Sequence, residues 1–320
     1  MTQPFFSVII PVFNRAHELN GAVRSILAQT FQDFEIVVVD DGSHDDPKAV
    51  VRTFDDPRIR YIRQENGGGG AARNRGIDLA RGQFVAFLDS DDSYLPHHLE
   101  AMHGLVEGTK GLVAYARMIV DRGNGRTLVK PPRAIRPGEH MATYLLCDRG
   151  FVPTITIVVE AERARRIRYS ETLRAAEDMD FAVRLFIDGA RFVMAEEPGA
   201  VWNDQYNPNR TSAGRKGVRL QEWLQTIRDD IPARAYYGCM GWAYAKHVAV
   251  KEPFRALGYY LTALEHNCYS PKLAAIIFLQ IFLPDRMYRR LADLAVAWLS
   301  LRRKAGVEQQ DAAALPAQAA

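Results

Sequence analysis

Apolar and polar residues alternate in blocks along the first 120 residues. Five runs rich in Val, Ile and Phe predict strands at 6–13, 34–40, 59–62, 84–89 and 111–120. The segments between them repeat apolar residues at helical spacing and predict helices near 15–29, 46–54, 70–81 and 96–107. Strands that alternate with helices in this way predict an α/β fold, with a mostly parallel sheet covered by helices on both faces.

The pattern changes in the second half of the chain. After a Gly-, Pro- and Arg-rich segment at 121–138, expected to be a loop, it predicts a helix at 139–147, a strand at 153–159, a helix beginning AERARR, a helix at 173–189 and a strand at 191–196. The helix at 173–189 is expected to bury Phe181, Val183, Leu185, Phe186 and Ile187. Beyond about 215 the pattern is almost wholly helical, and its aromatic residues are expected in the core. We predict an α/β domain at 1–215, a helical extension at 216–304 and a disordered tail at 305–320.

Composition and charge exclude several classes of protein. The net charge of +3 is too small to indicate a nucleic-acid partner. Cys147, Cys239 and Cys268 form no CxxC pair, which indicates a reducing compartment and neither a zinc site nor a disulfide framework. The N-terminus lacks the features of a signal peptide. The longest apolar run, 273–283, would rise about 16 Å as a helix, roughly half of a bilayer core. We therefore expect a cytoplasmic protein.

Carboxylates follow two of the predicted strands. Asp89, Asp91 and Asp92 come directly after the run FVAFL, and VVVDDGS ends a second strand in the same way. Ligands of open parallel sheets bind outside the carboxyl ends of the strands, so both acidic ends point to one binding rim. Asp89 and Asp91 are two residues apart and face the same side of an extended chain, where they could bind Mg²⁺ or Mn²⁺ together with substrate phosphates. The alternative is a solvated acidic turn.

The stretch ENGGGGAARNRG at 65–76 has two interpretations. It fits a dinucleotide-binding fingerprint, with Asp89 twenty residues after Gly69. That fingerprint normally follows the first strand, however, and here it follows the third, so a nicotinamide-dependent oxidoreductase is a minor alternative. Arg73 and Arg75 lie at the start of the next predicted helix, where arginines suit a phosphate. Simple solvent exposure remains open for Arg75.

Glu177 and Asp178 begin the helix predicted at 173–189. Acids are common at helix N-termini, because the helix dipole stabilises them. A carboxylate that is ionised at neutral pH can also accept a proton as a general base. Both interpretations remain open from the residues alone.

Four separated stretches together resemble the family 2 glycosyltransferases: SVIIPVFNR, VVVDDGS, GGGGAARNRGIDLARGQFVAFLDSDD and AAED. The resemblance covers roughly residues 5–210 and implies the GT-A fold and an inverting transfer from a nucleoside-diphosphate sugar, with a UDP-sugar favoured. It implies that Asp178 deprotonates the acceptor hydroxyl. It implies that the Asp-Ser-Asp triplet is a DXD motif, in which Asp91, with Asp89, binds Mn²⁺ or Mg²⁺. The donor-binding residues that it implies are Pro11, Phe13, Arg15, Asp40, Arg73, Asp89, Ser90 and Asp91.

The sequence departs from the family pattern at two places. The QxxRW signature of processive members does not occur, so we expect single additions to a glycan or lipid-linked acceptor, in surface polysaccharide or lipopolysaccharide synthesis. Many relatives place a His in the segment that matches 205–212, where this chain has Asn207. Arg210 or Ser212 could replace that contact. A GT-A-like binding module that has lost catalysis is the main alternative.

The segment at 272–304 carries seven basic and two acidic residues beside two apolar runs. This composition is typical of an interfacial amphipathic segment, which would hold the enzyme at the cytoplasmic face of the inner membrane. A buried helix with a solvated basic face has the same composition. Both interpretations remain open.

Overall fold

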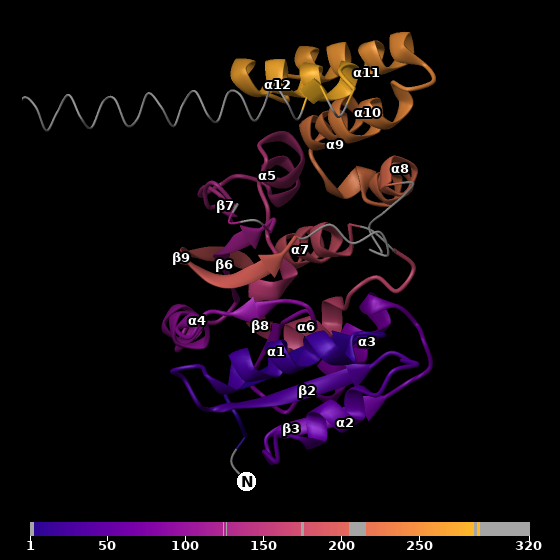
Figure 1. The fold of residues 1–320 in the computed structure, drawn as a ribbon. Coiled ribbons are helices and arrows are strands. Elements are labelled where there is room, and N and C mark those ends of the chain that lie inside the picture. Colours follow the sequence, from indigo (N-terminus) through magenta and orange to yellow (C-terminus); the bar gives the residue numbers. More distant parts are fainter. Residues whose placement is uncertain are drawn as a thin grey trace, which may run out of the picture.

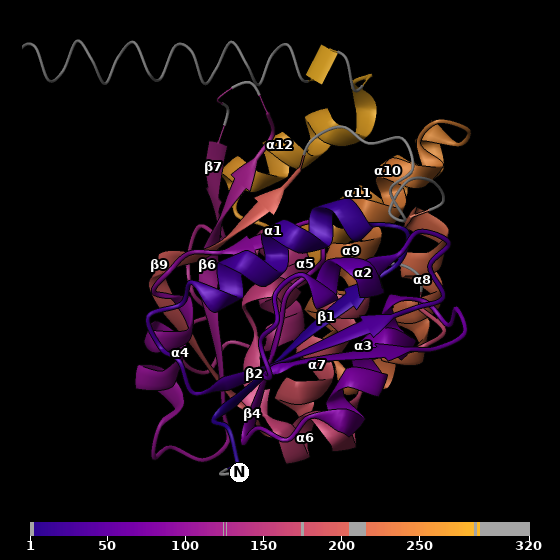
Figure 2. The ribbon, with the colours of Figure 1, turned by 60° about the horizontal axis from the view of Figure 1, so that its bottom comes forward.

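The computed structural model describes residues 3–123, 125, 127–173, 176–204, 216–284 and 287–288 (Figures 1 and 2). Its strands are β1 (Phe6–Val12), β2 (Phe34–Asp40), β3 (Ile59–Arg63), β4 (Phe84–Phe87), β5 (Ser93–Tyr94), β6 (Leu112–Asp121), β7 (Thr127–Lys130), β8 (Val158–Glu160) and β9 (Arg191–Asn203). The helices of the α/β part are α1 (Ala16–Leu27), α2 (Pro47–Arg52), α3 (Gly69–Leu79), α4 (His98–Val106), α5 (Met141–Cys147), α6 (Ala161–Ile167) and α7 (Glu177–Ile187).

The sheet reverses its strand order beside β1. Its order is β3-β2-β1-β4-β8-β6-β9-β5, and β7 pairs with β6 at the side. Strands β3, β2, β1 and β4 are parallel, and Ile9 of β1 lies opposite Val37 of β2 and Phe87 of β4. The chain runs from β1 outward to β2 and β3, and then returns to place β4 on the other side of β1. This reversal makes a crevice beyond the carboxyl ends of β1 and β4, the usual ligand position in such sheets.

Helices cover both faces of the sheet, as the sequence predicts. Alternate residues of one strand enter different cores, since successive side chains point to opposite faces. Val8 and Ile10 pack with Leu19 of α1 and Leu99 of α4. Ile9 belongs to the other core, which includes side chains of α3 and α7. The sheet is therefore buried on both faces, which explains the nearly continuous apolar runs of β1, β2 and β4.

The structure corrects four local predictions. The segment at 121–138 is not all loop, because it contains β7, which pairs antiparallel with β6. The strand predicted at 153–159 is a short 3-10 helix (Thr154–Thr156) followed by β8, and β9 continues well beyond residue 196. Ile187 is 45% exposed rather than buried. It lies two residues after the buried Leu185 and therefore faces nearly the opposite side of α7.

The described residues beyond 215 are mostly helical, as predicted. They form α8 (Lys216–Thr226), α9 (Ala233–Cys239), a π-helical turn (Met240–Tyr244), α10 (Ala245–Val248), α11 (Pro253–Glu265) and α12 (Pro271–Phe282). Trp223 and Ile227 extend the same core as Phe181 of α7. Cys147, Cys239 and Cys268 are free and buried. Among the residues described, no helix has the length and apolar character needed to cross a membrane.

Candidate active site

An ion pair joins the two sides of the crevice between β1 and β4. Arg15 follows β1, Asp91 follows β4, and their side chains form a close salt bridge. Each side chain is 27% exposed, so the pair is accessible from solvent. Burial raises the pKa of Asp91 and the nearby Asp89 carboxylate raises it further, whereas Arg15 opposes the change. The two carboxylates are therefore close enough to repel each other, as their spacing in sequence predicts.

A second arginine, Arg73, forms a salt bridge with Asp89. Arg73 lies in the second turn of α3, and its Nη2 donates to Asp89 Oδ1 at 2.6 Å, while its Nη1 lies 3.7 Å from Glu177 Oε1. Its side chain is only 8% exposed, and its guanidinium lies 5.3 Å from the ring centroid of Tyr169. Neither Nε nor Nη1 has a hydrogen-bond partner among the described residues. Arg73 is thus a buried cation with unused donors, placed between Asp89 and the start of α7.

Asp178 lies in the first turn of α7, next to Glu177. The helix begins after Ala176, which has a left-handed φ of 68°, and its first turn carries Glu177, Asp178 and Asp180. Burial raises the pKa of Asp178 to about 6, and the neighbouring Glu177 carboxylate adds to this increase. Arg73 opposes the rise, and Asp89 contributes to it. A carboxyl group with this pKa is mostly ionised at neutral pH and can accept a proton, as a general base requires.

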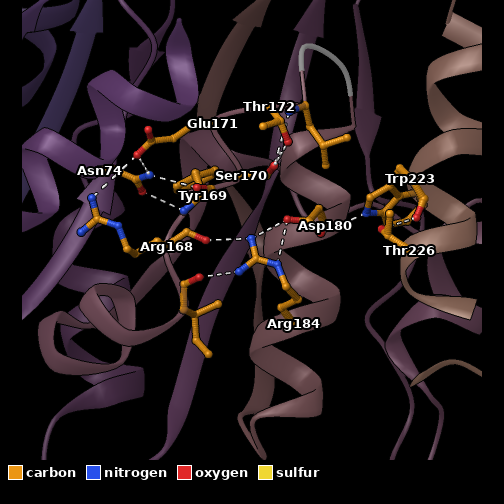
Figure 3. Close-up of polar contacts among 12 residues, drawn as sticks. Asn74, Arg168, Tyr169, Ser170, Glu171, Thr172, Asp180, Arg184, Trp223 and Thr226 are labelled. Atoms are coloured by element: carbon orange, nitrogen blue, oxygen red, sulfur yellow. Dashed lines mark hydrogen bonds and ion pairs between the residues drawn. The ribbon is translucent and has the colours of Figure 1, made fainter. Parts of the chain in front are cut away.

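A polar network fixes the position of the loop that leads to α7 (Figure 3). Asn74 of α3 donates to the Tyr169 carbonyl at 2.9 Å and accepts from the Tyr169 N–H at 2.8 Å. Gly70 packs against the same loop, because an added Cβ would lie 2.4 Å from the Ser170 carbonyl oxygen. Asn74 was not among the predicted site residues. Its contacts are 95 residues away in sequence, so only its place beside Arg73 in the ARNR stretch could have indicated it.

The same network continues from α7 into the helical extension (Figure 3). Asp180 is buried, accepts from Trp223 Nε1 of α8 at 2.9 Å, and forms a close salt bridge with Arg184. Arg184 also donates to the Arg168 carbonyl at 2.7 Å. The helix that carries Asp178 is therefore held by the preceding loop on one side and by α8 on the other.

The glycine stretch is anchored by Asp41, which the sequence analysis did not single out. Asp41 accepts from the backbone N–H groups of Gly67 and Gly68 at 2.9 and 2.8 Å, and from Gln64 Nε2 at 2.8 Å. Gly68 has a φ of 90°, a conformation that favours glycine, and α3 begins at the next residue. These glycines turn the chain and allow close packing. Because the N–H groups of Gly67 and Gly68 donate to Asp41, they are not available to bind a phosphate.

Asp40 is fully buried at the end of β2. It accepts from the Ser43 N–H at 2.8 Å, from the Tyr61 hydroxyl in a close contact, and from Arg63 Nη1 at 3.4 Å. Burial alone would raise its pKa, but the hydrogen bonds from Tyr61 and Ser43 lower it overall. Asp40 thus holds the loop after β2, and its contact with a nucleotide base stays a prediction.

The remaining predicted residues lie around the same crevice. Pro11 is in β1, and Phe13, just after it, is 43% exposed with its ring centroid 6.5 Å from that of His44. Ser90 is buried in the turn between the two aspartates. The third carboxylate of the cluster, Asp92, accepts from the Asn203 N–H at 2.9 Å and so joins this turn to the end of β9. Asn207, Arg210 and Ser212 lie outside the described residues.

The two carboxylates after β4 form a donor set that suits a hard cation. The carboxylates of Asp89 and Asp91 lie on one short turn, are partly exposed to solvent, and would offer oxygen ligands to a cation. In the described part of the chain, no three His, Cys, Asp or Glu side chains are grouped so that they alone could hold a metal ion. Mg²⁺ and Mn²⁺ sites commonly use one or two carboxylates and complete the shell with waters and substrate phosphates. The residues present therefore fit such an ion when a phosphate ligand accompanies it.

A cavity of about 700 Å³ adjoins this turn. The first half of α1 lines it on one side, and Asp91, Asp92 and Ser93 line it on the other. Among the described residues of its lining, Asp91 is the predicted site residue, whereas Arg73 and Asp178 do not line it.

Comparison with known proteins gives consistent matches. A family model described as "Glycosyl transferase family 2" matches residues 7–172. The chain is 30% identical over 247 residues to the amylovoran biosynthesis glycosyltransferase AmsB of Erwinia amylovora, covering 72% of this chain and 80% of AmsB. It is 46% identical over 103 residues to the GalNAc(5)-diNAcBac-PP-undecaprenol beta-1,3-glucosyltransferase of Campylobacter jejuni, covering 31% and 33% of the two chains. The structure of S. aureus TarS 1–349 in complex with UDP-GlcNAc has a TM-score of 0.64 at 19% identity, covering 86% of this chain and 87% of that one.

Proposed function

The chain belongs to glycosyl transferase family 2 and is a glycosyltransferase with the GT-A fold, and we propose that it transfers a sugar from a nucleoside-diphosphate sugar to a glycan or lipid-linked acceptor in polysaccharide synthesis. The name of AmsB, which refers to amylovoran biosynthesis, supports the polysaccharide assignment. The undecaprenol-linked glycan in the name of the Campylobacter enzyme supports the acceptor class. The UDP-GlcNAc complex of TarS supports a UDP-sugar donor.

The observation that carries this proposal is the pair of arginine–carboxylate contacts at the crevice. Arg15–Asp91 and Arg73–Asp89 place two cations and two carboxylates where β1 and β4 end. The guanidinium groups suit a diphosphate, because arginine donates two parallel hydrogen bonds to phosphate oxygens. Asp91, with Asp89, would hold Mg²⁺ or Mn²⁺. When bound, that cation supplies positive charge that stabilises the departing diphosphate.

Asp178 is the base in this proposal. The acceptor oxygen forms a bond to the anomeric carbon, the bond from that carbon to the diphosphate oxygen breaks, and its electron pair leaves with the nucleoside diphosphate. The proton of the acceptor hydroxyl passes to the Asp178 carboxylate, whose pKa of about 6 leaves it mostly ionised at neutral pH. Because the attacking and leaving oxygens occupy opposite faces of the sugar, one displacement inverts the anomeric configuration.

Titration calorimetry with UDP and GDP, each with and without Mn²⁺, tests the donor half. We expect manganese-dependent nucleotide binding, weakened at least about ten-fold by Asp91→Asn, because the site then loses one charged oxygen ligand. Asp178→Asn is the matched variant, and we expect its nucleotide affinity to stay within a few fold of wild type. A nucleotide affinity that changes neither on addition of Mn²⁺ nor with Asp91→Asn would contradict the assignment of the metal site.

Donor hydrolysis and transfer assays test the chemistry. We expect slow hydrolysis of the nucleotide sugar by the wild type and none by Asp178→Asn. A protein that binds the donor but neither hydrolyses nor transfers it would be the inactive binding module. A protein that binds a nicotinamide dinucleotide instead of UDP or GDP would be the oxidoreductase. Either result would overturn the proposed function.

A further inference from the structure

Exposed apolar side chains gather in one part of the helical extension. Among the described residues, nine large apolar side chains are exposed, and six of them lie between residues 250 and 287. Val250 and Phe254 are 88% and 87% exposed, the highest values of the nine. Single exposed apolar residues are normal on soluble proteins, but a concentration of them marks an interaction surface. We name these six side chains the apolar stripe: Val250, Phe254, Leu261, Phe278, Leu279 and Met287.

The α11–α12 hairpin places most of these side chains on its outer side. Phe254 and Leu261 are seven residues apart and share one face of α11, whereas Ala256, Tyr260 and Ala263 are buried on the opposite face. On α12 the buried residues likewise occupy one face and Phe278 and Leu279 are exposed. The Tyr260 hydroxyl donates to the Ala274 carbonyl at 3.0 Å, and the ring centroids of Tyr260 and Phe278 are 5.6 Å apart, so α12 packs against the buried face of α11.

The hairpin also lies far from the donor crevice. Figure 1 shows α11 and α12 at the end of the molecule opposite β2 and β3, with α8 and α9 between them and the sheet. The apolar stripe is therefore separate from the donor site, and its exposure does not result from an absent nucleotide.

The charge around the apolar stripe is positive. Lys246, Lys251 and Lys272 are exposed in the same helices and turns, together with Glu265, while Arg255 forms an ion pair with Glu252 at 3.0 Å. Apolar side chains surrounded by lysine and arginine suit an anionic lipid surface, where the rings enter the acyl boundary and the cations meet the headgroups.

A second copy of the chain is a less suitable occupant. A symmetric dimer would place the same surface of each copy against the other, so that like positive charges would face each other. Anionic lipid headgroups attract these positive charges, so docking on lipid avoids the repulsion.

We propose that the apolar stripe docks the enzyme on an anionic lipid bilayer. The docking itself is independent of the transfer reaction, but its purpose rests on the proposed function, because a lipid-linked acceptor is presented at such a surface. The turn from Val250 to Phe254 enters the bilayer interface, and Leu261, Phe278 and Leu279 lie along it. The surrounding lysines and arginines make the attraction dependent on anionic headgroups and on ionic strength.

Vesicle flotation of the full chain tests this proposal. We expect the wild type to float with phosphatidylglycerol-containing vesicles and to remain in solution with vesicles of phosphatidylcholine alone. The double variant Val250→Asp/Phe254→Asp should lose at least about ten-fold in partitioning, since two apolar side chains no longer enter the interface. Both residues are almost fully exposed, so the variant should unfold at the same temperature as the wild type. Val129→Asp, at an exposed position in β7, is the matched control and should float like the wild type.

Three outcomes would overturn the docking surface. The first is a wild type that floats with neither vesicle type. The second is a double variant that floats as well as the wild type. The third is a wild-type dimer in light scattering that the double variant abolishes while neither protein floats, because the stripe would then join two copies of the chain. Hydrolysis of the nucleotide sugar in solution, measured in parallel, should be equal in all three proteins. If the wild type does not hydrolyse the nucleotide sugar, the proposed function is contradicted, but the flotation result still decides whether the stripe docks on lipid.

Discussion

Replacing Asp178 by Asn is expected to abolish transfer and, at neutral pH, to stabilise the fold. The Asp178 carboxyl has an ordinary pKa of 3.8, and burial together with Glu177 raises it to about 6 in the folded protein. Between these values the folded state holds a proton that the unfolded chain releases. Stability therefore falls as the pH rises from about 4 to about 6, and the loss persists at higher pH.

The magnitude follows from the difference between the two pKa values. About two pH units correspond to at most about 3 kcal/mol of unfolding free energy, since each unit is worth about 1.4 kcal/mol. Asn has nearly the same shape and does not ionise, so Asp178→Asn should recover part of this energy. Transfer should fall by about 100-fold or more, the usual contribution of a general base.

Urea unfolding of the wild type and the variant at pH 4 and pH 7.5 measures the effect. We expect similar stabilities at pH 4 and a more stable variant at pH 7.5. Asp180→Asn is the control, because Asp180 is bound by Trp223 and Arg184 and its replacement should destabilise the fold at pH 7.5. A stability difference that does not change with pH, or an Asp178→Asn enzyme that keeps more than about one hundredth of the wild-type transfer rate, would refute the reasoning.

Three further changes test the surroundings of the base. Glu177→Gln removes a charge that raises the pKa of Asp178, so the acid limb of the kcat profile should move to lower pH; an unchanged limb would mean that Asp178 does not control it. Trp223→Phe keeps the buried ring but leaves Asp180 without one donor, and should cost about 1.5–3 kcal/mol in urea unfolding. Gly70→Ala should destabilise the loop before α7, because its Cβ would lie 2.4 Å from a backbone carbonyl; a normal melting temperature would contradict that packing.

The sequence predicts the residues at the crevice well, because each of them directly follows a strand that its own local pattern predicts. The strands β1 and β2 begin and end within one residue of their predicted bounds, and parallel strands necessarily bring Asp89 and Asp91 to the same edge as Arg15. Periodicity carries no information about partners far along the chain. Asn74 binds a loop 95 residues later, and no pattern in either segment announces the contact. Helical periodicity does not separate exposed from buried apolar residues, so Phe254 and Leu261 have the spacing expected of a buried face. Phe278 and Leu279, in contrast, lie in the segment at 272–304, whose composition left an interfacial position open.

The shared core of α7 and α8 limits how this protein can be recombined with its relatives. The division predicted near residue 215 separates the two helices in sequence, yet Trp223, Ile227 and Ile231 pack in one cluster with Phe181. A chimera joined at the end of β9 would pair α7 of one enzyme with α8 of another. Exchange of the C-terminal helices should therefore succeed only when the joint lies beyond α9, so that α7 keeps the Trp223 side chain that packs against it.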